Sequence, residues 1–296
     1  MSEPRPIDGS WRAAHPLPRH PPGTDKNSRG RVLLVGGAEF VPGALRLTGE
    51  AVLRAGAGKL QLATVERVAT ALGVLMPEAA IIALPSDPKG EIAESANEVL
   101  DRAVGDCDTL IAGPGMSDGL HTEGLVRELL ASPRADLSIV LDAAAISCAR
   151  DLAPVIAGHQ RRAILTPHFG EMAALTGLSE DDVAARPVAI ARDVAKAFGA
   201  VVVLKGNATV IASPTGEMLG YASDCIGLAT GGSGDVLAGI IGGLAARGAS
   251  PFEAAAWGVW IHGEAGGRCA DTIGAIGFLA RDLLIHIPAL MADREV

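Results

Sequence analysis

The amino-acid sequence predicts an α/β fold, with a mostly parallel central sheet of about eight or more strands and helices on both faces. Two observations support this prediction. Short runs of Val, Ile and Leu alternate with longer segments of helical periodicity from Arg31 almost to the end of the chain. Of the 296 residues, 49% are hydrophobic and only 3% are aromatic, which suits a buried parallel sheet covered by helices rich in small residues.

Eight strands are expected from short β-branched or Leu-rich runs. They are Val32–Val35, Leu60–Thr64, Ala80–Leu84, Thr109–Ala112, Ser138–Leu141, Ala163–Leu165, Val201–Leu204 and Thr209–Ala212. Several are followed by Gly, Asp or Thr-Pro. Because open α/β sheets bind their ligands at the carboxyl ends of the strands, functional residues are expected in the loops that follow.

Helical periodicity is clearest in four segments and in the last part of the chain. The segments are Ala44–Ala55, Gly119–Leu130, Asp181–Phe198 and Asp235–Ala246, and Pro251–Ile287 is almost wholly helical in pattern. No stretch of linker composition and no fixed-period repeat divides the chain after residue 30. Residues 30–296 are therefore predicted to form one domain.

Residues 1–29 differ in composition from the rest of the chain. They hold several prolines among Arg and His, and they lack the apolar run of a signal peptide or a membrane anchor. We expect a proline-rich strap or tail. The longest strongly apolar stretch, Val236–Ala246, is too short to span a bilayer, so no membrane association is expected.

The formal net charge of −9 gives no basic surface for nucleic acid or an anionic membrane. Four cysteines lie far apart, with neither a CxxC pair nor the spacing of metal ligands: Cys107, Cys148, Cys225 and Cys269. This pattern predicts incidental thiols in a reducing compartment, which indicates a cytoplasmic protein.

The sharpest motif is the segment Ala229–Asp235, which leads directly into an apolar helix. Its residues Gly231, Gly232, Ser233 and Gly234 allow backbone N–H groups to converge on an anion, and the positive end of the helix dipole reinforces them. Asp235 follows in the first turn, where it can act as a general base in phosphoryl transfer. The alternative is that Asp235 only interacts favourably with the helix dipole.

The common nucleotide motifs are absent from the sequence. Neither GxxxxGK[ST] nor GxGxxG occurs, which disfavours a P-loop and a standard dinucleotide-binding fold. The segment Lys205–Thr209 follows a buried strand, and its Lys and Gly can meet nucleotide phosphate or ribose. The alternative is a hairpin turn with a solvated lysine.

Three further features lie at the ends of strands. His168 is placed to contact a ligand, whereas His262 lies in a helical segment and is expected to be packed in the core. Asp142 can bind substrate or water on Mg²⁺, or can cap a helix. The glycines of Gly36-Gly37 and of the turn from Gly113 to Gly115 allow close approach of a ligand or form simple turns.

Taken together, these motifs resemble the ADP-dependent (S)-NAD(P)H-hydrate dehydratase family of the ribokinase-like superfamily, which also forms the carboxy-terminal half of bifunctional nicotinamide-nucleotide repair proteins. The resemblance runs from about Gly30 to Pro288. It is carried by Arg31–Gly37, Pro42–Ala44, Leu53–Lys59, Gly113–Gly115, Leu141–Ala143, Leu165–His168, Gly170-Glu171, Leu204–Gly206 and Ala229–Asp235.

The resemblance implies a lyase that restores hydrated NADH or NADPH at the expense of ADP, with release of AMP and phosphate. It implies Asp235 as the catalytic base and Ala44, Gly113, Gly115, His168 and Asp235 as substrate contacts. The implied nucleotide contacts are Lys205, Gly206, Asn207, Ala208, Thr209, Gly232, Ser233 and Gly234. It also implies Mg²⁺, ADP as co-substrate with ATP as a further candidate, and a homotetramer.

The sequence departs from the family pattern at three places. LDADAL reads Leu141–Ile146 with Ala144 in place of the second acid, TGNPGMAT reads Ser223–Thr230, and the Pro after TPH is Phe169. Two alternatives therefore stay open. One is a vitamin kinase of the hydroxyethylthiazole or pyridoxal type, which would keep the phosphate on its product; the other is a non-catalytic nucleotide-binding protein, in which replacing Asp235 would change nothing.

Overall fold

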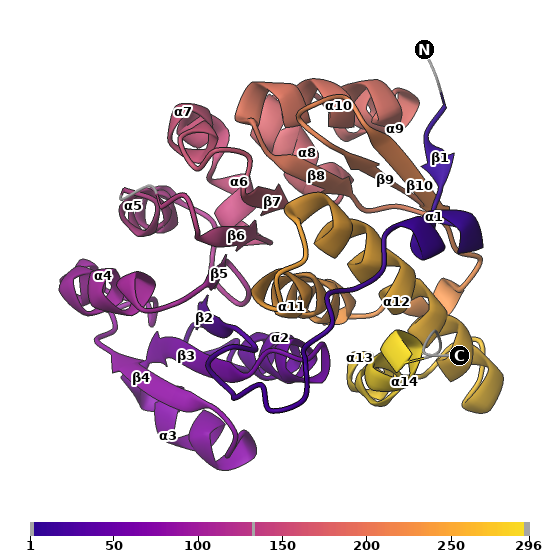
Figure 1. Ribbon diagram of the computed structural model, residues 1–296. Coiled ribbons are helices and arrows are strands. Elements are labelled where there is room, and N and C mark those ends of the chain that lie inside the picture. Colours follow the sequence, from indigo (N-terminus) through magenta and orange to yellow (C-terminus); the bar gives the residue numbers. More distant parts are fainter. Residues whose placement is uncertain (1–2, 132–133, 293–296) are drawn as a thin grey trace.

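The computed structural model describes residues 3–131 and 134–292, and its strands form one ten-stranded sheet. The order is β1-β10-β9-β8-β7-β6-β5-β2-β3-β4 (Figure 1). The strands from β8 to β4 are parallel, the pairs β8–β9 and β9–β10 are antiparallel, and β1 is parallel to β10. Their bounds are β1 Arg5–Pro6, β2 Arg31–Val35, β3 Lys59–Val65, β4 Ala80–Leu84, β5 Thr109–Ala112, β6 Ser138–Leu141, β7 Ala163–Leu165, β8 Val201–Leu204, β9 Ala208–Ala212 and β10 Met218–Ala222.

Helices cover both faces of the sheet, as the sequence predicts (Figure 1). Those of eight or more residues are α2 Gly43–Arg54, α3 Glu66–Leu75, α4 Asn97–Gly105, α5 Leu120–Leu129, α8 Phe169–Thr176, α10 Pro187–Phe198, α11 Ser233–Ala246 and α12 Pro251–Thr272. The shorter ones are α1 Gly9–Ala14, α6 Ala144–Ser147, α7 Ala153–Ala157, α9 Glu180–Ala185, α13 Ala280–Leu283 and α14 Ile287–Ala292.

Alternate residues of the strands point to opposite faces and form two hydrophobic cores. Leu34 and Ile111 pack with α2, α11 and α12 on one face, whereas Leu33 and Leu110 pack with α4, α5, α8 and α10 on the other. The central strands β5 to β8 are buried throughout. This arrangement presents the carboxyl ends of the parallel strands at one edge of the sheet.

The structure differs from the sequence prediction in two helical segments. The segment 181–198 divides into α9 and α10 at Pro187, because proline has no N–H group to continue a helix. The segment 251–287 is interrupted between Thr272 and Ala280, where Gly274 and Gly277 adopt positive φ angles.

Strands β1 and β10 were not expected, since β1 has two residues and β10 contains Gly220.

The N-terminal segment packs on the edge of the sheet and on α12. Strand β1 pairs with β10, and Trp11 of α1 is buried with 2% of its surface exposed. The guanidinium of Arg12 lies 3.8 Å from the centre of the Trp260 ring. The indole N–H of Trp257 donates a 2.7 Å hydrogen bond to the carbonyl of His15. Residues 5–15 are therefore bound to the domain by backbone pairing and aromatic packing.

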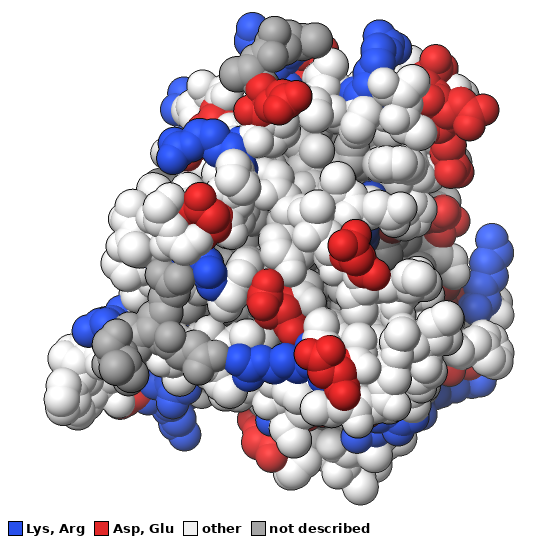
Figure 2. Space-filling view, turned by 90° about the vertical axis from the view of Figure 1, so that its right-hand side faces the viewer, with Lys and Arg blue, Asp and Glu red and all other residues white. Residues whose placement is uncertain are grey.

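Charged side chains of both signs lie on the face of the molecule shown in Figure 2. On the face shown in Figure 2, Lys and Arg side chains are interspersed with Asp and Glu, and no broad basic patch appears. Across the described ranges, no helix combines the length and apolar character that a membrane span requires. All four cysteines are unpaired.

Candidate active site

The loops after β6, β7 and β8 meet the first turn of α11. Helix α11 begins at Ser233, and the preceding residue Gly232 has a φ angle of 89°, a conformation that favours glycine. The Ser233 N–H donates to the Thr230 carbonyl, whereas the N–H groups of Gly234 and Asp235, in the first turn, have no intrahelical partner and favour an anion. The predicted anion-binding turn is thus formed at a helix N-terminus.

Lys205 lies beside this turn and is held by two carboxylates. Its Nζ is 3.0 Å from Asp142 Oδ1 and 3.5 Å from Glu171 Oε2. A Cβ atom on Gly234 would lie 3.4 Å from the same Nζ. Burial lowers the pKa of Lys205, but the two carboxylates outweigh it and raise the pKa above its ordinary value. The ammonium group is therefore fixed next to the turn, and is not a solvated hairpin lysine.

The Asp142 carboxylate contacts both Thr166 and Lys205. Its Oδ1 accepts a 2.6 Å hydrogen bond from the Thr166 hydroxyl as well as the contact from Lys205. Helix α6 begins at Ala144 with Ala143 as its N-cap and without a side-chain cap, so the alternative that Asp142 caps a helix is wrong. Asp142 instead joins the ends of β6, β7 and β8.

Asp235 occupies the first turn of α11, and its environment suits a base. Burial raises the pKa of Asp235 to about 7, the negative charges of Asp142 and Glu171 act in the same direction, and Lys205 opposes them. A base with a pKa near neutral accepts a proton efficiently at physiological pH. Asp235 therefore combines a position at a helix N-terminus with basicity.

His168 and Glu171 form a reciprocal cap at the start of α8. The Nδ1 atom of His168 accepts from the Glu171 N–H at 3.2 Å, and Glu171 Oε2 accepts from the His168 N–H at 2.7 Å. Burial raises the pKa of Glu171, while Lys205 lowers it. Glu171 was not among the predicted site residues, although its spacing of three residues from a capping residue was a signal. The Nε2 atom of His168 lies 3.4 Å from Glu171 Oε1, so the imidazole contacts the same carboxylate that lies beside Lys205.

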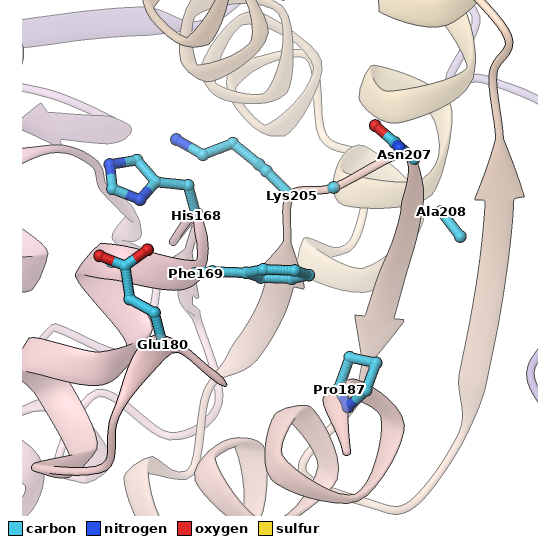
Figure 3. Close-up of a pocket in the computed structure, with 9 residues that line it drawn as sticks. His168, Phe169, Glu180, Pro187, Lys205, Asn207 and Ala208 are labelled. Atoms are coloured by element: carbon cyan, nitrogen blue, oxygen red, sulfur yellow. The ribbon is translucent and has the colours of Figure 1, made fainter. Parts of the chain in front are cut away.

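A cavity of about 510 Å³ opens between the loop after β7 and the turn between β8 and β9 (Figure 3). It is lined by His168, Phe169, Gly170, Glu180, Pro187, Lys205, Gly206, Asn207 and Ala208. The Phe169 ring lies close to Gly206, where a Cβ would be 3.2 Å from the ring. Thr209 follows on β9 and donates its hydroxyl to the Gly206 carbonyl. The cavity therefore unites His168 with most of the segment predicted to bind nucleotide.

The predicted substrate contacts at the other strands lie around α2. A Cβ on Gly115 would be 3.1 Å from Ala44, and Gly113 has a φ angle of 116°. Gly232 packs against Leu47, one turn after Ala44 on α2. Helix α2 thus connects the turn from Gly113 to Gly115 with the anion-binding turn.

His262 is not a simple core residue. It lies on α12, and its Nε2 atom is 3.0 Å from both the hydroxyl and the carbonyl oxygen of Ser233. The sequence analysis expected only packing for this residue, because the contact joins residues 29 positions apart. His262 therefore reaches the first residue of the anion-binding turn.

The carboxylates near the first turn of α11 suit a metal ion that is bound by both protein and phosphate oxygens better than one that is bound by protein side chains alone. Within residues 3–131 and 134–292 there is no group of three or more His, Cys, Asp or Glu side chains placed to hold a metal ion. Asp142 and Glu171 offer carboxylate oxygens near the anion-binding turn. Mg²⁺ is commonly held by one or two carboxylates together with substrate phosphates, so these residues fit it.

Comparison with known proteins identifies the family. The family model described as NAD(P)H-hydrate dehydratase matches residues 32–289. The ADP-dependent (S)-NAD(P)H-hydrate dehydratase of Xanthomonas campestris is 45% identical over 287 residues, which are 97% of this chain and 96% of that protein. The bifunctional NAD(P)H-hydrate repair enzyme of Moorella thermoacetica is 38% identical over 94% of this chain, which spans 52% of that protein.

Solved structures agree with the sequence comparison. The ADP/ATP-dependent NAD(P)H-hydrate dehydratase of Bacillus subtilis, co-crystallised with ATP and Mg²⁺, superposes with a TM-score of 0.80 at 27% identity, covering 99% of both chains. A ribokinase-like superfamily protein of Enterococcus faecalis superposes with a TM-score of 0.80 at 25% identity, covering 94% of this chain and 92% of that chain, which confirms the ribokinase-like fold expected from the sequence. The protein belongs to the NAD(P)H-hydrate dehydratase family, a family of hydro-lyases.

Proposed function

We propose that this protein dehydrates (6S)-NADH hydrate and (6S)-NADPH hydrate at the expense of ADP, and so returns damaged nicotinamide nucleotides to use. The observation that carries the proposal is the placement of Asp235, a buried carboxylate with a pKa of about 7, in the first turn of the anion-binding helix. The relative that is 45% identical to this chain is named for this activity, and the alignment covers 96% of that protein.

The proposed chemistry turns a poor leaving group into a good one. Asp235 takes the proton of the hydroxyl at C6 of the hydrated nicotinamide while the hydroxyl oxygen attacks the β-phosphorus of ADP. The new O–P bond forms, the bond from the β-phosphorus to the bridging oxygen breaks, and AMP leaves. The lone pair of the ring nitrogen then expels phosphate by cleavage of the C6–O bond, and loss of a proton from C5 restores the double bond.

The other residues position and stabilise the phosphoryl group. In this proposal the N–H groups of Gly234 and Asp235 and the ammonium of Lys205 stabilise the negative charge that develops on the transferred group. Asp142 and Glu171 hold that ammonium in place. We assign Lys205, Gly206, Asn207, Ala208, Thr209, Gly232, Ser233 and Gly234 to the nucleotide, and Ala44, Gly113, Gly115 and His168 to the hydrated dinucleotide.

Mg²⁺ would neutralise phosphate charge when bound together with ADP or ATP. Asp142 and Glu171 are the residues that would hold it. Neither carboxylate is free of protein contacts, because Lys205 lies between them. We therefore propose that the cation is bound mainly through the phosphates and their water shell.

A vitamin kinase is the second candidate, because Asp235 and the anion-binding turn would serve that reaction as well. The fate of the phosphate separates the two. The protein is incubated with NADH hydrate, ADP and Mg²⁺ while absorbance of the dihydronicotinamide and free phosphate are followed together. Equal formation of NADH and phosphate supports the dehydratase; formation of a phosphorylated product without free phosphate supports a kinase.

Asp235→Asn is the matched variant for this assay, since it keeps the shape of the side chain and removes the base. Turnover should fall by at least about 100-fold while ADP affinity changes little. An unchanged rate in this variant would show that Asp235 is not the base, and activity that a second purification removes from both proteins would support the non-catalytic alternative.

We also propose that the protein acts in the cytoplasm as a homotetramer. Unpaired cysteines suit a reducing compartment. Large apolar side chains such as Phe40 and Leu120 lie at the surface, where a subunit contact would cover them. Light scattering coupled to size exclusion measures the mass directly, and a mass of one chain would contradict the tetramer.

A further inference from the structure

His262 is a polar side chain on a helix face that is otherwise apolar. Its neighbours Trp260 and Ile261 are buried, and burial lowers the pKa of His262 to about 4. The ring is therefore neutral at physiological pH. An apolar side chain would fill the same space without the cost of burying a polar group, so packing alone does not explain a histidine here.

The contact with Ser233 defines which ring nitrogen carries the proton. Nε2 lies 3.0 Å from the Ser233 carbonyl oxygen, which can only accept a hydrogen bond. A bare Nε2 would place two lone pairs against each other, so Nε2 carries the proton. The Ser233 hydroxyl oxygen, also 3.0 Å from Nε2, then shares this N–H as an acceptor. The proton of the hydroxyl itself is left for another partner.

Both backbone polar groups of Ser233 are hydrogen-bonded. Its N–H donates to the Thr230 carbonyl at 3.2 Å, and its carbonyl receives the His262 N–H. The next two N–H groups, of Gly234 and Asp235, belong to the first helical turn. The direction of these N–H groups therefore depends on how Ser233 is held.

We propose that His262 is a positioning residue of the active site, which holds Ser233 through Nε2–H so that the serine hydroxyl and the following N–H groups point at the transferred phosphoryl group. The ligand recognised through this contact is the terminal phosphate of ADP. The phosphoryl-transfer role rests on the proposed function, whereas the orientation of the turn and its effect on phosphate binding do not.

Helix packing does not depend on this contact. Helices α11 and α12 also meet where Gly258 lies against Ile241, one turn from His262 on the same face of α12. Removal of the imidazole should therefore leave the fold intact and disturb the turn locally. This separation makes the proposal testable with folded variants.

The test compares His262→Leu, His262→Gln, Ser233→Ala and the double variant His262→Leu/Ser233→Ala in the full-length protein. His262→Leu should lower kcat for phosphate release about tenfold or more, with KM for NADH hydrate within about twofold. His262→Gln, which keeps an N–H donor, should recover most of the loss. In the double-mutant cycle the two changes should be less than additive. Additive effects, or no rescue by Gln, would overturn the proposal.

ADP binding with Mg²⁺, measured by calorimetry, provides a readout that needs no turnover. His262→Leu should weaken binding and His262→Gln should restore it, and this result would stand even if no dehydration were observed. Wild-type affinity in a folded His262→Leu protein would overturn the proposal. If His262→Leu does not fold, ¹⁵N spectra of the wild-type ring decide: a proton on Nε2 supports the proposal, and a proton on Nδ1 contradicts it.

Discussion

The raised pKa of Asp235 predicts how activity depends on pH. The folded-state pKa of about 7 arises from burial and from two neighbouring carboxylates. Only the ionised form can take a proton from the substrate. The value of kcat/KM should therefore rise with pH and level off above an apparent pKa of about 7. A profile that is flat between pH 5.5 and 8.5 would show that Asp235 is not the base whose ionisation limits the rate.

The same raised pKa predicts a cost in stability. Asp235 binds a proton more tightly in the folded state than in the unfolded chain, where its pKa is ordinary. The contribution of Asp235 to the free energy of unfolding therefore falls as pH rises from about 4 to 7. Asp235→Asn should raise the free energy of unfolding at pH 8 by about 1–3 kcal/mol, and by much less near pH 4. Chemical denaturation at both pH values measures the difference; an equal change at both would contradict the linkage.

Helix α11 depends on close approach to α2. A Cβ on Gly239 would collide with the Thr48 carbonyl and lie 2.6 Å from Ala51. Gly239→Ala should therefore cost about 1–3 kcal/mol of stability by overpacking, and should lower activity because Leu47 of α2 also packs against the anion-binding turn. Gly124→Ala in α5, where the added Cβ meets open space, is the control and should not destabilise. Similar melting temperatures for both variants would contradict this account of the packing.

Sequence reasoning found the elements that have strong local signals. Eight strands were predicted from β-branched runs, whereas β10 was missed because its run is interrupted by Gly220 and β1 because it has only two residues. The residues of the anion-binding turn were predicted because their pattern is contiguous. The capping spacing of Glu171 was a local signal for its place at the start of α8, but its contact with Lys205 and the contact of His262 with Ser233 join distant segments, which no local pattern specifies.

Over the whole molecule, we propose that the N-terminal segment, described from residue 3 to residue 29, forms a strap that stabilises the edge of the sheet. Trp11 is buried and stacks on His15 with 4.5 Å between the ring centres. Trp11→Ala should cost about 3–5 kcal/mol if the segment stays bound, and less if it detaches. Limited proteolysis distinguishes these outcomes through cleavage before residue 30. Unchanged stability together with unchanged proteolysis would contradict the strap.

The central claim is that the oxygen bound to C6 of the hydrated substrate becomes part of the released phosphate. NADH hydrate labelled with ¹⁸O at the C6 hydroxyl is converted in the presence of ADP and Mg²⁺, and the phosphate is analysed by mass spectrometry. The account predicts one ¹⁸O atom in each phosphate released during turnover. The Asp235→Asn control should form far less labelled phosphate in the same time. Label found in water, with unlabelled phosphate, would contradict phosphorylation of the hydroxyl by this site.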